Sequence, residues 1–299
     1  MSRRSSASLL KAVKDSGKKT GVVVTEDDKR RITMLARWYS LSPEHIARDE
    51  LAEYIWNPDL NPTPTDEDQS AFASKVYAVK RRLARLARIE ESGTHIGPLV
   101  GGGRFDYNDS TWFATQYGST AASLPWKLRS SINPQFVRHA WFAADVGLQV
   151  QRLGHSVLSE RELSTGVTAE SEDVLLNMNS AFVNTNTGVK TNKKPDVAVL
   201  SSEQDKYIAI EVENDKNRPL NTYAEKLTAY DANTDVSAIW YLCSSQTTAN
   251  RVGQVASNLF GKGGGFPLRI RVIEERDGWR GIARLPQDER LMNDLEEMR

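Results

Sequence analysis

Cysteine is almost missing from this chain of 299 residues, which contains Cys243 alone. One cysteine excludes an internal disulfide framework and a zinc site built from cysteines, and it fits a reducing cytoplasm. Net charge is missing as well, because 39 Lys and Arg residues balance 39 Asp and Glu residues. The chain therefore has no global positive field for nucleic acid, and only a local one remains open.

Long apolar runs are also missing. No run approaches the roughly 20 residues that a membrane helix needs, and no apolar segment follows the basic N-terminus as a secretory signal requires. We therefore expect a cytoplasmic protein with no membrane partner. The length predicts two domains, each large enough to bury its own core.

The first part of the chain shows helical periodicity. Residues 1–25 are rich in Ser and basic, which predicts a flexible tail. Apolar residues at helical spacing predict a first helix over 27–39, Pro43 begins a short second helix, and a long third helix covers 70–89.

A glycine-rich loop over 93–103 and a strand over 111–115 follow these helices, as in a flexible β-hairpin. Three helices followed by such a wing predict a winged helix-turn-helix over residues 26–124. In this fold the last helix enters the major groove of DNA.

The long third helix is strongly basic on or beside the face opposite its apolar stripe. The residues concerned are Lys75, Lys80, Arg81, Arg82, Arg85 and Arg88. Lys and Arg neutralise backbone phosphates, so we predict that these residues bind double-stranded DNA. A solvated charged surface is the alternative for this helix taken by itself.

Prolines interrupt the chain at 125–134, where we place the domain linker. Helical and strand-like segments then alternate over 135–285, which predicts a mixed α/β layer fold in which helices flank a sheet. Residues 286–299 are charged and predict a surface tail, which is a helix or a frayed end over 288–299.

Two strand-like runs within that region, 193–200 and 206–216, predict a hairpin with an acid in each run. Antiparallel pairing would bring Asp196 beside Glu211. Crowded carboxylates repel unless a cationic side chain or a divalent ion such as Mg²⁺ lies between them. We predict a metal site held by Asp196 and Glu211, and an ordinary hairpin with solvated acidic ends is the alternative.

Pro195-Asp196, a spacer and Glu211-x-Glu213 resemble the core of the PD-(D/E)xK (restriction-endonuclease-like) nuclease superfamily. The resemblance implies an Asp and a Glu that hold Mg²⁺ and a Lys that assists the attacking water. This chain has Glu213 where the pattern requires Lys, so other lysines nearby are the substitutes. The implied catalytic residues are Glu160, Asp196, Glu211, Glu213, Lys216 and Lys226.

The order of all these features over roughly residues 27–245 resembles the replication-relaxation family of actinobacterial plasmid and phage proteins. The resemblance implies DNA binding by the winged helix-turn-helix and a role in the replication or maintenance of a mobile element, with a nuclease-like domain that is degenerate or active. An active Mg²⁺-dependent endonuclease and a transcriptional repressor are the alternatives. Whether the protein forms a homodimer stays open.

Overall fold

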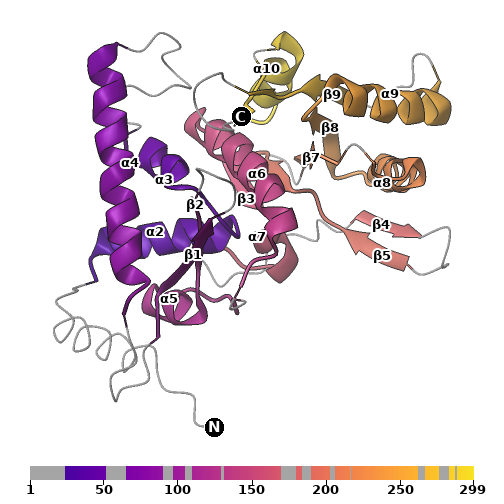
Figure 1. Ribbon diagram of the computed structural model, residues 1–299. Coiled ribbons are helices and arrows are strands. Elements are labelled where there is room, and N and C mark those ends of the chain that lie inside the picture. Colours follow the sequence, from indigo (N-terminus) through magenta and orange to yellow (C-terminus); the bar gives the residue numbers. More distant parts are fainter. Residues whose placement is uncertain are drawn as a thin grey trace. The chain divides into compact units, whose positions relative to one another are not determined.

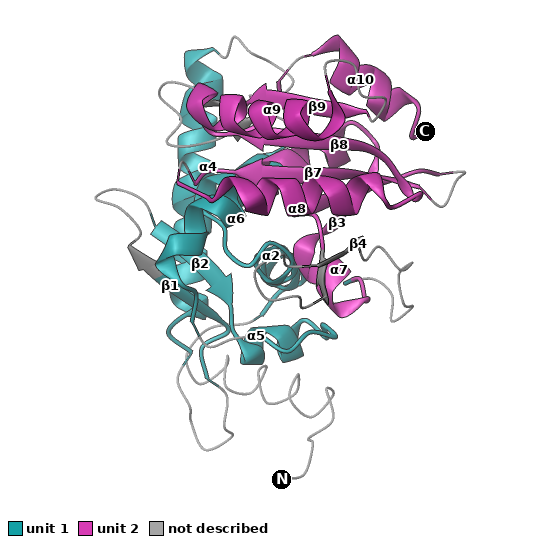
Figure 2. Cartoon of the chain, turned by 90° about the vertical axis from the view of Figure 1, so that its right-hand side faces the viewer, with its two compact units in different colours: residues 1–141, 169–172 teal, residues 142–168, 173–299 magenta. Residues whose placement is uncertain are grey.

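The computed structural model (Figure 1) describes residues 24–51, 65–89, 97–104, 110–128, 131–169, 180–183, 190–202, 206–215, 217–261, 267–275, 283–286 and 288–299. The chain forms two compact units, residues 1–141 with 169–172 and residues 142–168 with 173–299 (Figure 2). The boundary lies inside helix α6 (Pro134–Arg152), C-terminal to the segment 125–134 in which we predicted a linker. None of the described helices is both long enough and apolar enough to cross a membrane.

Side-chain caps determine where the helices of unit 1 begin. Its described helices, besides part of α6, are α2 (Glu26–Arg37), α3 (Pro43–Leu51), α4 (Asp66–Leu86) and α5 (Gln116–Ala121). The Thr25 hydroxyl oxygen accepts the Asp28 N–H at 3.2 Å, and the Asp28 carboxylate accepts the Thr25 N–H at 2.8 Å. Thr65 and Asp68 cap α4 in the same way. These capping boxes satisfy N–H groups that a first helical turn leaves without partners.

Two antiparallel strands complete unit 1, β1 (Val100–Arg104) and β2 (Ser110–Ala114), and Leu41 adds an antiparallel bridge to Trp112. The glycines of β1 lie inside the strand, whereas the sequence predicted a loop over 93–103. A Cβ atom on Gly101 would collide with the ring of Phe113 on the paired strand. Any larger residue at Gly101 would therefore force the Phe113 ring, which lies over the backbone of β1, to shift.

Unit 2 contains a mixed sheet of five strands in the order β3, β6, β7, β8, β9. The strands are β3 (Ser156–Ser159), β6 (Val197–Leu200), β7 (Tyr207–Glu213), β8 (Val236–Cys243) and β9 (Leu268–Val272). Neighbours are antiparallel from β3 to β7 and parallel from β7 to β9. The mixed helix-and-sheet class predicted from the sequence is thereby confirmed.

Helices cover both faces of this sheet. Helices α8 (Leu220–Asp231) and α9 (Gln246–Phe260) pack against the face that carries Tyr241 (Figure 2). Side chains alternate along a strand, so Trp240 points to the other face, where its Nε1 donates to Asp294 of α10 (Glu289–Glu296) at 2.9 Å.

The C-terminal segment 286–299, predicted as a charged surface helix or frayed end, contains helix α10 over Glu289–Glu296. Asp294 joins this helix to the sheet, because it accepts from Trp240 of β8 at 2.9 Å and from Arg269 of β9 at 2.8 Å. Leu291 and Leu295 of the helix are buried.

Strand β3 ends at Ser159. Helix α7 (Glu160–Thr165) begins there, because the Glu162 carboxylate accepts the Ser159 N–H at 2.8 Å in a capping box. The remaining strands form two antiparallel pairs, β4 (Ser180–Val183) with β5 (Lys190–Lys193) and β10 (Glu274–Glu275) with β11 (Ala283–Arg284).

Candidate functional sites

Helix α4 places part of its basic side chains in internal ion pairs. The guanidinium of Arg82 bonds Asp28 of α2 through two nitrogens, with Nε to Oδ1 at 2.8 Å. The Asp28 side chain is fully buried. Burial alone would raise the pKa of Asp28, but hydrogen bonds from Arg82 and Thr25 outweigh it and hold the pKa below its usual range. Arg82 therefore stabilises the packing of α4 against α2.

A second acid, Glu50 of α3, holds two cations. Lys75 Nζ lies 2.7 Å from Glu50 Oε2, and Arg31 Nε of α2 donates to Glu50 Oε1 at 2.5 Å. The Glu50 side chain is only 3% exposed. Lys75 and Arg82 were predicted to bind DNA, yet both are engaged in joining the three helices.

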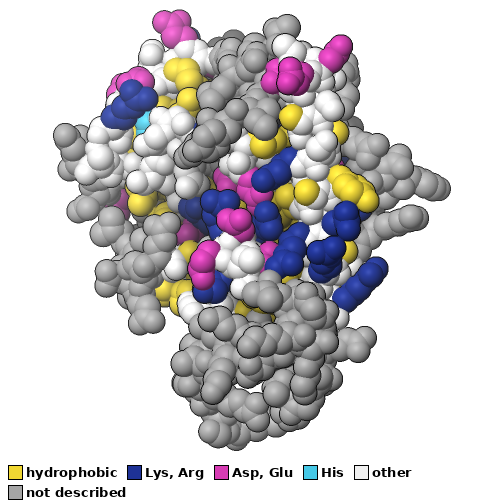
Figure 3. Space-filling view, turned by 90° about the vertical axis from the view of Figure 1, so that its left-hand side faces the viewer, with side chains coloured by type: hydrophobic (Ala, Val, Ile, Leu, Met, Phe, Trp, Pro, Cys, Tyr) yellow, Lys and Arg dark blue, Asp and Glu magenta, His cyan; other side chains and the backbone are white. Residues whose placement is uncertain are grey.

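The other predicted DNA-binding residues are exposed. They are Lys80, Arg81, Arg85 and Arg88. Tyr77 lies one turn before Arg81 with 63% of its surface exposed, and the Arg81 guanidinium carbon lies 5.7 Å from the centre of its ring. On the α4 side of the molecule, Lys and Arg side chains gather with a few acids between them (Figure 3). This part of α4 presents positive charge beside an aromatic ring.

The acidic corner predicted in unit 2 is formed by two neighbouring strands. Val197, the first residue of β6, pairs with Ile210 of β7. Asp196 precedes Val197 and Glu211 follows Ile210, so the two acids lie next to each other. Asp196 Oδ2 accepts the Val212 N–H at 2.8 Å. Asp196 is 8% exposed and Glu211 is 2% exposed, so both carboxylates are in the interior.

Each carboxylate oxygen of Glu211 has a donor from α8. Lys226 Nζ donates to Oε2, and the Tyr230 hydroxyl donates to Oε1 at 2.5 Å. Lys226 and Tyr230 are four residues apart and hence lie on one face of the helix, directly over Glu211. The sequence singled out Lys226 as a substitute lysine, and it did not identify Tyr230.

Glu213, which occupies the position where the nuclease pattern has Lys, binds a different cation. Arg218 Nε lies 2.7 Å from Glu213 Oε2, and the Asp215 N–H donates to Oε1 at 2.8 Å. The Arg218 side chain is 28% exposed and thus the part of this cluster nearest to solvent. The sequence analysis did not identify Arg218 as a site residue. Its position just before Pro219, which precedes α8, could have indicated that it lies near the end of β7.

Burial and oppositely charged neighbours shift the pKa values of this cluster in opposite directions. Burial raises the pKa of Glu211 against the pull of Lys226, and it raises the pKa of Glu213 against Arg218. Burial alone would lower the pKa of Lys226, but Glu211 and Asp196 outweigh it and raise that pKa. The ordinary pKa of Lys lies about six units above that of Glu, so we assign the proton to Lys226 and describe its contact with Glu211 as an ion pair.

Two buried tyrosines, Tyr223 and Tyr241, belong to the hydrophobic core that α8 and β8 share. The Tyr223 and Tyr241 hydroxyls are buried and have no hydrogen-bond partner in the described part of the chain. Their rings meet edge to face with centroids 6.2 Å apart, and burial raises the pKa of both. Burial also raises the pKa of the nearby Cys243 to about 12, with Glu213 adding to the rise, so this thiol is a structural hydrophobe rather than a nucleophile.

Two other predicted site residues have different positions. Glu160 begins α7, where its N–H donates to the Asp196 carbonyl at 3.0 Å. Burial lowers the pKa of Lys194, and the negative charge of the Glu160 carboxylate partly opposes that decrease. Glu160 is thus joined to the acidic strand through the backbone. Lys216 lies outside the described residues.

The donor set at Asp196 and Glu211 does not fit Mg²⁺ as it is arranged. Magnesium requires several oxygen ligands at close range, and the oxygens of Glu211 already accept from Lys226 and Tyr230. Within the described residues, no three His, Cys, Asp or Glu side chains converge as metal ligands. Mg²⁺ at this site remains a prediction that requires Lys226 to withdraw.

No family model, no curated protein and no solved structure matches this chain.

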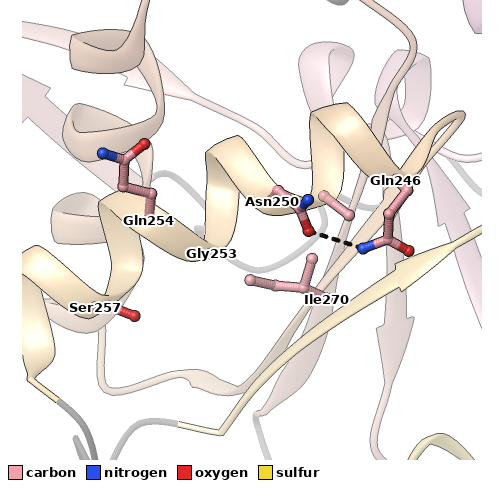
Figure 4. A pocket seen from close by; sticks show the side chains of 7 residues that line it. Gln246, Asn250, Gly253, Gln254, Ser257 and Ile270 are labelled. Carbon is pink, nitrogen blue, oxygen red and sulfur yellow. Dashed lines mark hydrogen bonds between the residues drawn. The ribbon is translucent and has the colours of Figure 1, made fainter.

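An open groove lies elsewhere on unit 2, between α9 and β9 (Figure 4). It has a volume of about 520 Å³ and is lined by Gln246, Ala249, Asn250, Gly253, Gln254, Ser257 and Ile270. Gln246 Nε2 donates to Asn250 Oδ1 at 2.8 Å along the α9 side of the groove. These lining residues carry no titratable side chain, so the groove offers hydrogen bonds and no acid, base or nucleophile.

Proposed function

We propose that this protein binds double-stranded DNA through helix α4 and acts in the replication or maintenance of a plasmid or phage. The element order α2, α3, α4, β1, β2, with Leu41 bridging β2, agrees with a winged helix-turn-helix in unit 1. The role in a mobile element rests on the sequence resemblance to the replication-relaxation family. We propose unit 2 as a nuclease-like PD-(D/E)xK scaffold.

The observation that carries DNA binding is the division of charge on α4. Arg82 and Lys75 are neutralised by Asp28 and Glu50, which leaves Lys80, Arg81, Arg85 and Arg88 exposed at the C-terminal part of the helix and just beyond it. Positive charge presented in this way neutralises phosphates, and each contact makes binding weaken with salt. The exposed ring of Tyr77 adds a surface for stacking on sugar or base.

The test is fluorescence anisotropy with duplex DNA at several salt concentrations. We expect Arg81→Ala with Arg85→Ala to weaken binding and to reduce the slope of log K against log salt by about 0.9 for each lost contact. Lys127→Ala, which removes an exposed charge of unit 1 outside α4, is the matched control. Unchanged affinity and slope in the double variant would refute the proposal.

A Mg²⁺-dependent endonuclease is the second candidate. Two observations favour it. In the five-stranded sheet of unit 2, β3, β6 and β7 are antiparallel neighbours, and α8 connects β7 to the parallel strand β8. The ammonium group of Lys226 contacts Glu211 beside Asp196. Cleavage of supercoiled and linear DNA in the presence of Mg²⁺ is the assay. Cleavage that Asp196→Asn and Glu211→Gln both abolish would establish this activity, whereas no cleavage by the wild type would leave unit 2 as a scaffold.

A further inference from the structure

We infer that the ammonium group of Lys226 takes the place of a divalent metal ion in the buried acidic site, so that unit 2 carries its own cation. The inference concerns unit 2 alone and stands independently of DNA binding by α4. It predicts that the wild-type site does not bind Mg²⁺ or Mn²⁺, and that removing Lys226 creates a site that does.

Occupied oxygen atoms are the first support. Donors to the carboxylates of Asp196, Glu211 and Glu213 include the N–H groups of Val212 and Asp215 and the side chains of Lys226, Tyr230 and Arg218. Val212 donates to Asp196 Oδ2. Tyr230 and Lys226 donate to Oε1 and Oε2 of Glu211. Asp215 and Arg218 bind Oε1 and Oε2 of Glu213. A hard cation binds through such oxygens, so a metal ion would have to displace donors that are already in place.

Charge and burial are the second support. Asp196, Glu211 and Lys226 are each at most 8% exposed. In an interior of low dielectric, a divalent ion next to a protonated ammonium group is strongly repelled. Moving Lys226 away would leave its charge without Glu211, and breaking a buried pair by removing one partner is strongly unfavourable. The lysine and a metal ion are therefore alternatives at this position.

The position of Lys226 on α8 is the third support. Tyr230, one turn further along the same helix, donates to the second oxygen of Glu211 at 2.5 Å. The two side chains thus hold one carboxylate from both sides, and the packing of α8 on the sheet determines where the ammonium group lies. A tethered cation held in this way requires no metal supply and no exchange with solvent.

The experiment measures Mn²⁺ binding to the full chain by electron paramagnetic resonance, together with thermal unfolding with and without millimolar Mn²⁺. The variants are Lys226→Met, Lys226→Arg, and Lys226→Met combined with Glu211→Gln. Lys206→Met removes an exposed lysine of the same unit and is the matched control.

We expect no Mn²⁺-dependent change in wild type, Lys206→Met or Lys226→Arg. Lys226→Met should unfold at a lower temperature, bind Mn²⁺ more than about tenfold more tightly than wild type, and regain stability with Mn²⁺. Adding Glu211→Gln should remove this response. Of the three acids only Asp196 and Glu213 then remain, and they need no cation in addition to Arg218, which pairs with Glu213.

Two results would overturn the inference. One is a wild-type protein that binds Mn²⁺ and loses this binding with Glu211→Gln, since the ion and Lys226 would then coexist. The other is a folded Lys226→Met protein that is indifferent to Mn²⁺. If Lys226→Met does not fold, even with Mn²⁺, the wild-type measurement decides.

Discussion

Replacing Arg82 by Ala should destabilise unit 1 without touching a DNA contact. The change removes both nitrogens that bond Asp28, whose side chain is fully buried, and leaves Arg31 Nη1 at 3.4 Å and the cap hydrogen bonds from Thr25. Breaking a buried ion pair costs about 3–5 kcal/mol. The Arg82 side chain is 22% exposed and Asp28 keeps its cap, so we expect a loss of about 2–3 kcal/mol in the free energy of unfolding.

Urea unfolding followed by circular dichroism measures this loss. With a slope of about 2 kcal/mol per molar, the midpoint of the unfolding transition of unit 1 should fall by about 1–1.5 M urea. Arg85→Ala is the matched control: Arg85 is exposed on the same helix, and its removal should change stability by less than about 0.5 kcal/mol. DNA binding should respond in the opposite sense, weaker for Arg85→Ala and unchanged for folded Arg82→Ala. Equal stability of Arg82→Ala and wild type would refute the argument that Arg82 is a structural residue.

Other predictions concern single groups. Tyr230→Phe removes the donor to Glu211 Oε1 and should lower the free energy of unfolding by about 1–3 kcal/mol. Tyr223→Phe removes a hydroxyl that has no hydrogen-bond partner among the described residues, and it should be neutral in the same urea titration. Arg82 and Thr25 depress the pKa of Asp28, so its contribution is present above about pH 4 and is lost as pH falls through the folded-state pKa. The measurement is the free energy of unfolding between pH 6 and 3, which should therefore fall less in Asp28→Asn than in wild type. An equal fall in both proteins would contradict the stabilising role of the ionised Asp28. Burial and the raised pKa of Cys243 predict that a thiol reagent at pH 8 modifies the protein only in urea; rapid labelling of the native chain would disprove this.

Local order along the chain follows from short-range patterns that the sequence displays directly. The apolar spacing of α2, the proline that begins α3 and the continuous apolar run of β8 each predict their element, because helix and strand periods are properties of consecutive residues. The same period of two places Asp196 next to Glu211 once β6 and β7 pair. The Ser159 capping box was equally visible in the sequence, and it prevailed over the strand pattern of its neighbours.

The partners of the charged residues depend on packing between segments that are remote along the chain. Asp28 and Arg82 are 54 positions apart, Asp294 and Trp240 are also 54 apart, and Glu211 meets Tyr230 only because α8 folds back over β7. A basic residue on an amphipathic helix has the same local pattern whether it binds phosphate or a buried acid. Which of the two it does is determined by the helix that packs against it, since an ion pair requires two side chains within a few ångströms of each other.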